Sequence, residues 1–252
     1  MQRKTKSLRR FFFRVYWKLE KLLVPNLRHS QDVYLKFLQT RVRPNSVWLD
    51  VGCGHHVLPV WNSTEENAIV RSCRMVVGVD RDLGSLENHK SISFRAVGDI
   101  SNLPFRNGVI DLVTANMVVE HLQKPERQFE EINRVLRGDG VFLMHTMNAL
   151  GYTTLFSRII PWPLKKILAG IIEGRLEKDI FPTYYKTNSE RRIRIIAAQT
   201  NFMVARLEMI VSSAKSVLLP PIVVLELLWL RLLMMRFMRP FRTNIIAVLR
   251  KR

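Results

Sequence analysis

Cysteine and acidic residues are both scarce in this chain. Its two cysteines, Cys53 and Cys73, are too few and too irregularly placed for a disulfide framework or a zinc site, which favours a reducing, cytosolic environment. Asp and Glu total 21 against 40 Lys and Arg, and the formal net charge is +19. We therefore expect an anionic partner. Composition alone leaves open whether that partner is a nucleic acid or an anionic membrane surface.

A long uncharged apolar segment is absent as well. The most apolar stretch, residues 217–241, contains Glu226 and three arginines, and only four residues separate Glu226 from Arg231. A membrane span needs about 20 mostly apolar residues. We therefore expect a hairpin or helix that lies in the membrane interface, with its arginines reaching lipid phosphates. A dimerisation helix is the alternative. The side chains expected to insert are Leu227, Leu228, Trp229, Leu232 and Leu233.

The N-terminal segment combines basic and apolar residues in a similar way. Residues 1–24 hold eight Lys and Arg and one acid, Glu20. Their apolar residues recur at helical spacing, which predicts a basic amphipathic helix of the kind that lies in a membrane interface. The alternative is a helix that packs on the domain and leaves its basic face in water. The segment has neither the smooth apolar core nor the small-residue cleavage site of a secretory signal.

Two apolar runs further along predict a ligand site. Val47–Val51 reads as a buried parallel strand that ends in a tight turn at Gly52 and Gly54, where the absence of a Cβ lets a ligand approach the backbone. Met75–Val79 predicts a second strand, and Asp80 at its tip is placed to accept hydrogen bonds from ribose hydroxyls. A dehydrogenase fingerprint would have three glycines running into a helix. Two glycines after an acid suit a ligand without a pyrophosphate.

This pattern resembles the class I S-adenosylmethionine-dependent methyltransferases, in particular their small-molecule, type 11-like branch. Asp50, Gly52 and Gly54 match the first motif of that family, and Asp80 matches its ribose-binding acid. The chain departs from the motif at His56, where a third glycine or small residue is usual. The resemblance covers about residues 30–150 and the last strand. It implies an α/β fold, a Rossmann-like doubly wound, mostly parallel seven-stranded sheet with the last strand antiparallel, and S-adenosyl-L-methionine as cofactor.

The resemblance also assigns roles to residues after the third and fourth strands. Asp99 would meet the adenine amino group and Ile100 would pack on the ring, while Asn116 and Met117 would lie near the cofactor. Members of this branch often carry a Glu-His pair just past the fourth strand, and His121 occupies that place. With an unperturbed pKa of about 6.5, a histidine can accept a proton near neutral pH. The alternative for His121 is a structural role in which it pins the following helix.

Four segments are expected from these patterns. They are a basic amphipathic N-terminal helix at 1–29, a cofactor-binding core at 30–150, a substrate cap at 151–200, and the last two strands at 201–252 with the apolar hairpin 217–241 inside them. Within the core we expect a capping box at Ser63 and Glu66, and a turn at 138–140 before the fifth strand. In the cap, Tyr184 and Tyr185 are candidates to line an acceptor pocket.

A metal site is not expected at His55 and His56. Side chains of successive residues rarely both face one ion, and no cluster of acids or cysteines is near them in the sequence. The favoured function is S-adenosylmethionine-dependent methylation of a lipophilic small-molecule acceptor by a monotopic enzyme on the cytoplasmic face of a membrane. The methyl group is expected to go to an oxygen, and a nitrogen or a carbon is the less expected target. One alternative is an RNA methyltransferase. The absence of an Asn-Pro-Pro-Tyr type motif after the fourth strand argues against it. The other is a non-catalytic binding protein with this fold, which His56 keeps open. Nucleic acid is the less expected partner, and a homodimer is possible.

Overall fold

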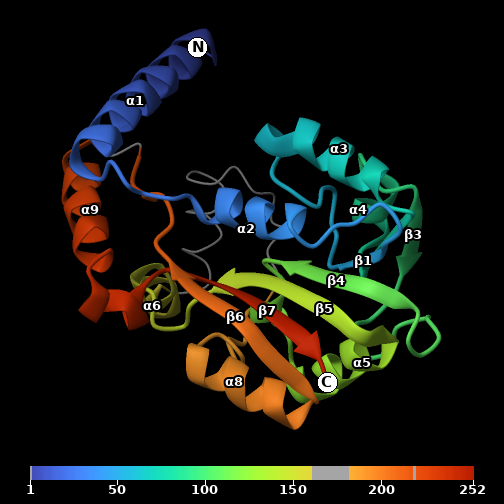
Figure 1. Cartoon of the computed structure of the whole chain (residues 1–252). Coiled ribbons are helices and arrows are strands. Elements are labelled where there is room, and N and C mark those ends of the chain that lie inside the picture. Colours follow the sequence, from blue (N-terminus) through green and yellow to red (C-terminus); the bar gives the residue numbers. More distant parts are fainter. Residues whose placement is uncertain (1, 161–181, 218–219) are drawn as a thin grey trace. The chain divides into compact units, whose positions relative to one another are not determined.

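The fold is built on one seven-stranded sheet, seen in a computed structural model that describes residues 2–160, 182–217 and 220–252. The strand order is β3-β2-β1-β4-β5-β7-β6. Strands β1 to β5 pair with one another in parallel, and β7 is antiparallel to β5 (Figure 1). This confirms the predicted mostly parallel sheet with one antiparallel strand. The strands are β1 Val47–Val51, β2 Met75–Asp80, β3 Phe94–Val97, β4 Ile110–Asn116, β5 Leu136–Met147, β6 Phe202–Ile210 and β7 Asn244–Lys251.

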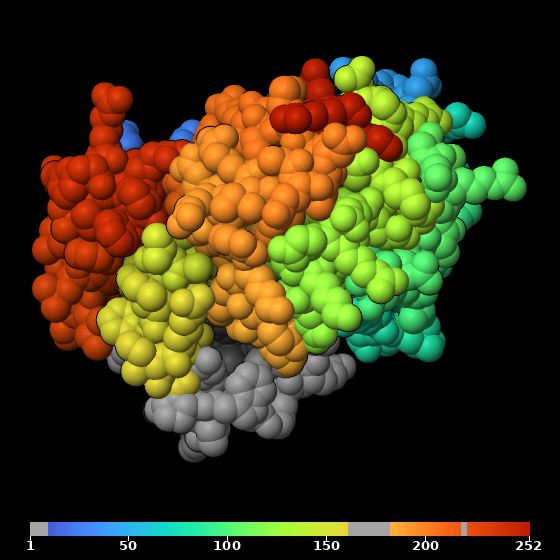
Figure 2. Space-filling model, turned by 90° about the horizontal axis from the view of Figure 1, so that it is seen from below, coloured from blue at the N-terminus to red at the C-terminus, as the bar shows by residue number. Residues whose placement is uncertain are grey.

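Helices cover both faces of this sheet. On one face lie α2 Ser30–Gln39, α3 Ser63–Ser72 and α4 Leu83–Glu87 (Figure 1). On the other face lie α5 Pro125–Val135, which is green in Figure 2, and α8 Glu190–Gln199, which is orange there. The inner strands β1, β4 and β7 are buried on both sides, which explains their mostly apolar sequences, whereas the edge strands β3 and β6 are partly exposed. Phe129 of α5 packs edge-on against Phe142 of β5, with ring centroids 5.3 Å apart, and both rings are fully buried.

Two local predictions were wrong. Ser63 is the first residue of α3, whose N-cap is Asn62, so there is no capping box there. Glu66 instead accepts hydrogen bonds from the Leu58 amide at 2.8 Å and from the Ser91 hydroxyl, and so fastens the loop that precedes the helix. The predicted turn at 138–140 lies inside β5, where the pairing with β4 shifts register and the extra residues form a bulge.

The described residues fall into two compact units, each formed from separate pieces of the chain. The sheet unit comprises residues 31–149, 182–208 and 245–252. The helical unit comprises 2–30, 150–160, 209–217 and 220–244. The helical unit contains α1 Gln2–Leu23, α6 Tyr152–Ile159, α9 Pro220–Leu233 and a 3-10 helix, η5, at Arg236–Phe241. The basic N-terminal helix and the apolar segment 217–241 therefore belong to the same unit. The part of the expected cap at 161–181 lies outside the described residues.

Helices α1 and α9 share the core of the helical unit. Leu227, Leu230 and Leu233 of α9 are fully buried and pack in one cluster with Tyr16 of α1 and with Val24, which directly follows α1. The expectation that Leu227 and Leu233 insert into a membrane is therefore wrong, because these side chains fill the interior of the unit. Leu228 and Trp229 lie on the other side of α9, with 48% and 39% of their surface exposed. None of the helices in the described ranges is long and apolar enough to cross a membrane.

Each of these two helices carries one inward-facing acid. Glu226 of α9 accepts hydrogen bonds from the amides of Lys215 at 2.9 Å and Ser216 at 2.8 Å, and from the Tyr152 hydroxyl at 2.5 Å. Glu20 of α1 is buried and accepts a hydrogen bond from Tyr16. These carboxylates thus hold loops and neighbouring helices in place by satisfying polar groups that would otherwise be buried without partners.

Candidate functional site

The loop after β1 combines left-handed backbone with open space. Gly52 and Gly54 have φ of 66° and 53°, a region that glycine occupies at little cost. A Cβ at Gly52 would lie 2.5 Å from Cγ2 of Val118, so that glycine is needed for packing. A Cβ at Gly54 would meet no atom within 4 Å. The backbone at Gly54 therefore borders open space at the strand tip, as a backbone that cradles a ligand requires.

Asp80 holds this loop from the tip of the neighbouring strand. Its Oδ2 accepts a hydrogen bond from the Gly54 amide at 2.9 Å, and its Oδ1 accepts one from the Asp82 amide at 3.0 Å. A carboxylate has about four lone-pair positions, so these two bonds leave capacity for the paired hydroxyls of a ribose. The structure thus places the predicted ribose-binding acid directly beside the glycine loop.

Asp50 lies behind the loop, beneath the surface. Its side chain is 2% exposed and accepts a hydrogen bond from the Thr114 hydroxyl, which in turn accepts one from the Trp48 indole at 2.7 Å. Burial raises the pKa of Asp50 to about 8 against the opposing effect of the Thr114 hydrogen bond, and the nearby acids Glu66 and Asp80 add to the rise. Asp50 therefore carries a proton through much of the neutral range and supports the loop from below.

Asp99 and Ile100 follow β3, the next strand in the sheet. Asp99 accepts a hydrogen bond from the Ser101 amide at 2.7 Å and forms an ion pair with Arg81. Burial opposes ionisation of Asp99, but the hydrogen bonds from Ser101 and Arg81 outweigh it and lower the pKa of the carboxyl. Sequence reasoning missed Arg81, although its position directly after Asp80 was a usable signal. Ile100 is half-buried beside Asp99.

Asn116 and Met117 end β4 on the other side of the glycine loop. The Asn116 amide exchanges hydrogen bonds with Gln31 of α2, donates to the Val57 carbonyl at 3.1 Å, and accepts from His145 Nδ1 at 2.8 Å. Met117 adopts φ of 59°, and its amide donates to the His145 carbonyl at 2.8 Å. The tip of β4 is therefore held rigidly from two sides.

Gln31 and His145 were not predicted as part of this site. Burial alone lowers the pKa of His145 to about 3, so the ring is neutral and its Nδ1–H is the donor to Asn116. The ring also stacks on Tyr34 of α2 at 5.7 Å between centroids.

His121 lies beside the segment that carries the two candidate acceptor-site tyrosines. Its Nδ1 is 2.7 Å from the Pro182 carbonyl, which can only accept, so Nδ1 carries the proton and the neutral ring has its lone pair on Nε2. The amides of Tyr184 and Tyr185 both donate to the Glu120 carbonyl, at 2.8 and 3.2 Å. The structure thus brings His121 next to the segment that carries Tyr184 and Tyr185.

Several strand tips therefore meet along one edge of the sheet. The glycine loop, Asp80, Asp99 and Asn116 follow β1, β2, β3 and β4, which are neighbours in the sheet, and the carboxyl edge of an open parallel sheet is where such folds bind ligands. In the described residues no group of His, Cys, Asp and Glu could hold a metal ion. His56 instead lies 4.0 Å from Glu66.

Comparison with known proteins agrees with this geometry. Residues 49–144 match the family model described as a methyltransferase domain. A malonyl-[acyl-carrier protein] O-methyltransferase from Legionella pneumophila is 29% identical over 120 residues, 45% of this chain and 38% of that relative. The chain covers between 38% and 61% of the length of three curated relatives.

Solved structures share the fold at low sequence identity. An S-adenosylmethionine-dependent methyltransferase from Mesorhizobium loti superposes with a TM-score of 0.56 at 13% identity, over 88% of this chain and 98% of that one. A geranyl diphosphate C-methyltransferase from Streptomyces coelicolor, solved with Mg2+, geranyl diphosphate and S-adenosyl-L-homocysteine, gives 0.50 at 14% identity, over 88% of this chain and 79% of that one.

Proposed function

Because residues 49–144 form a methyltransferase domain of the class I S-adenosylmethionine-dependent family, we propose that this protein methylates a lipophilic small-molecule acceptor, at an oxygen atom. The observation that carries the proposal is the pairing of the open glycine loop at Gly54 with the Asp80 carboxylate. The family uses S-adenosyl-L-methionine, and the residues at the strand tips fit it.

Each strand tip has a distinct part in holding that cofactor. The backbone at Gly52 and Gly54 leaves room for close approach, and Asp80 accepts hydrogen bonds from the ribose. Asp99 and Ile100 would recognise the adenine, and Asn116 and Met117 would border the methionine end. When bound, the cofactor supplies an electrophilic methyl group on a sulfonium. The protein's contribution is then mainly alignment, because in-line transfer depends on holding the acceptor within near-attack distance.

His121 is the group proposed to take the acceptor's proton. Its Nδ1–H donates to the Pro182 carbonyl, which fixes the orientation of the ring. Tyr184 and Tyr185, held on the Glu120 carbonyl, would contribute the aromatic wall of the acceptor pocket. An apolar acceptor is favoured by these aromatic side chains. The Streptomyces coelicolor geranyl diphosphate C-methyltransferase, which shares the fold, was solved with a ligand that joins an apolar geranyl chain to a charged diphosphate.

Methyl transfer from labelled cofactor into a total lipid extract, with total RNA as the parallel substrate, tests this proposal. We expect label in the lipid fraction. Asp80→Asn should lower cofactor affinity in calorimetry by about 1–3 kcal/mol, the range for hydrogen bonds to charged groups. Asp139→Asn, on an exposed bulge of β5, removes the same charge and should bind normally. Equal affinities for both variants would contradict the assignment of Asp80.

His121→Ala separates proton transfer from binding. General bases contribute about a hundredfold or more to turnover, so the variant should lose that factor while keeping its cofactor affinity. Normal turnover would return His121 to a structural role. Label in RNA but not in lipid would instead favour the RNA methyltransferase alternative, and cofactor binding without transfer to either would favour a non-catalytic binding protein.

A further inference from the structure

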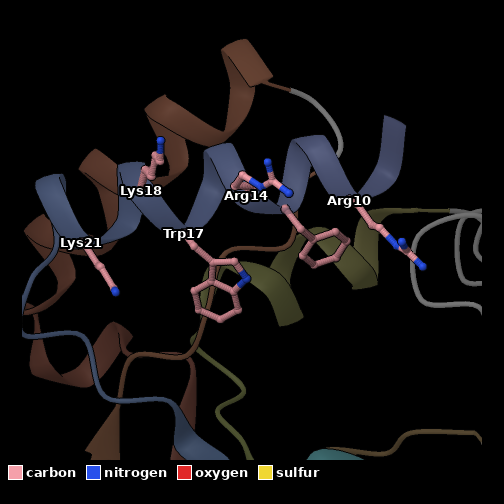
Figure 3. Close-up of a pocket in the computed structure, with 6 residues that line it drawn as sticks. Arg10, Arg14, Trp17, Lys18 and Lys21 are labelled. Atoms are coloured by element: carbon pink, nitrogen blue, oxygen red, sulfur yellow. The ribbon is translucent and has the colours of Figure 1, made fainter. Parts of the chain in front are cut away.

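The outward face of α1 is a basic strip edged by apolar side chains. Arg10, Arg14 and Lys21 follow one another at helical spacing, with Trp17 between them, and all four are exposed. Together with Phe13 and Lys18 they line a shallow pocket of about 390 Å³ (Figure 3). In the part of the chain that the structure describes, Arg10, Arg14, Lys18 and Lys21 form no ion pair.

Apolar exposure accompanies this charge on the same helix. Phe11, Trp17 and Leu22 are 57%, 45% and 74% exposed, whereas Tyr16 of the same helix is buried. The acid of this segment, Glu20, faces inward and accepts from Tyr16, so it neutralises none of the outward charge. An amphipathic helix with this combination suits a headgroup region, where cationic side chains meet phosphates and aromatic rings sit below them.

Helix α9 adds a second exposed apolar row in the same unit. Ile222, Leu225 and Leu228 are 51%, 69% and 48% exposed at a spacing of three residues, and Trp229 stands beside them. Their buried neighbours on α9 already complete the core of the unit, so these side chains are not needed there. A nucleic-acid surface would interleave its cations with polar groups, whereas here both helices present aliphatic and aromatic side chains.

We propose that the helical unit docks on an anionic lipid bilayer, with the basic strip of α1 on the headgroups and the exposed row of α9 in the interface. No helix need span the bilayer in this arrangement, and the attachment is peripheral. The inference does not depend on methyl transfer. Two attachments of different chemistry give binding with a salt-sensitive and a salt-resistant part, since screening weakens the charge contribution and leaves apolar insertion in place.

Flotation of the full chain with vesicles tests this surface. Wild type should float with phosphatidylserine-containing vesicles, much less with pure phosphatidylcholine, and only partly detach in high salt. Arg14→Glu/Lys21→Glu should weaken partitioning at least about 25-fold, because each basic residue near an anionic leaflet contributes roughly fivefold. Arg106→Glu/Arg191→Glu changes the net charge equally at exposed sites of the sheet unit and should bind as wild type.

A second pair of variants isolates the apolar contribution. Leu225→Ser/Leu228→Ser should abolish the salt-resistant fraction, whereas Phe94→Ser/Met203→Ser, at exposed positions of the sheet unit, should retain it. Calorimetry with S-adenosylmethionine on the same preparations verifies folding and reports separately on the proposed function. Wild type that stays in solution with anionic vesicles at low salt overturns the proposal. So does equal weakening by the two charge-reversal pairs, or preferential binding of RNA through the α1 arginines.

Discussion

Asp50 and Asp80 stand at the ends of neighbouring strands, yet their surroundings give them opposite properties. Asp80 is partly exposed and accepts hydrogen bonds from two backbone amides, which leaves carboxylate lone pairs open to further donors. Asp50 is buried under Thr114, and burial raises its pKa to about 8. The same residue type is therefore accessible at one strand tip, where we propose that it binds the ribose, and supports the packing of the loop at the other.

The protonated Asp50 should make folding stability depend on pH. An unfolded Asp has a pKa of about 3.9, so between about pH 4 and pH 8 the folded chain holds one proton more than the unfolded chain. The contribution of this group is complete at the acid end of that window and is lost as pH rises to about 8. The slope is at most about 1.4 kcal/mol per pH unit.

Asp50→Asn removes this titration and keeps an acceptor for Thr114. In urea unfolding followed across that window, the variant should gain stability relative to wild type as pH rises. Asp139→Asn, at an exposed position, is the control and should follow the wild-type profile. Parallel profiles for wild type and Asp50→Asn would mean that Asp50 is already ionised at neutral pH in the folded protein.

At the scale of elements, α9 shows how neighbouring leucines on one helix differ. Leu227 is fully buried in the cluster with α1, whereas Leu228 is 48% exposed. Leu227→Ala should lower the free energy of unfolding of the helical unit by about 2–5 kcal/mol, the range for deleting buried leucine atoms. Leu228→Ala should change it by less than about 0.5 kcal/mol. Hydrogen exchange of α9 amides in increasing urea measures both, and equal losses would contradict this orientation of α9.

The strands were the easiest elements to predict. Val47–Val51 and Met75–Asp80 are short apolar runs closed by glycine or aspartate, so their local sequence contains both the strand and its end. The bulge in β5 was missed, because Gly138 and Gly140 have the composition of a turn and only pairing with β4 keeps them in the strand.

Side-chain contacts between segments that are distant in the sequence could not be predicted from it. Gln31, Asn116 and His145 come from three separate elements, and no local pattern indicates that their side chains meet. Glu226 illustrates the same limit from the other direction. In the sequence it is a charge that interrupts an apolar stretch, and only the fold shows that it anchors Ser216 and Tyr152.

At the scale of the whole molecule, the division into two units makes a prediction about ligand protection. A ligand at 100 times its dissociation constant stabilises the state that binds it by about 2.7 kcal/mol. With S-adenosylmethionine at that excess, slowly exchanging amides of β1 and β4 in the sheet unit should exchange up to about a hundredfold more slowly. Amides of α9 in the helical unit are the internal control. Equal protection of α9 in hydrogen-exchange mass spectrometry would show that the two units open as one.

The interleaving of the two units also has a consequence for synthesis on the ribosome. Tyr16 is translated about 210 residues before Leu227, its neighbour in the core of the helical unit. At roughly 5–20 residues per second, the apolar face of α1 waits on the order of 10–40 seconds for α9 to emerge. During that interval a basic helix with an uncovered apolar face is available to a chaperone or to a lipid surface. The apolar face of α1 therefore needs protection until α9 has been translated.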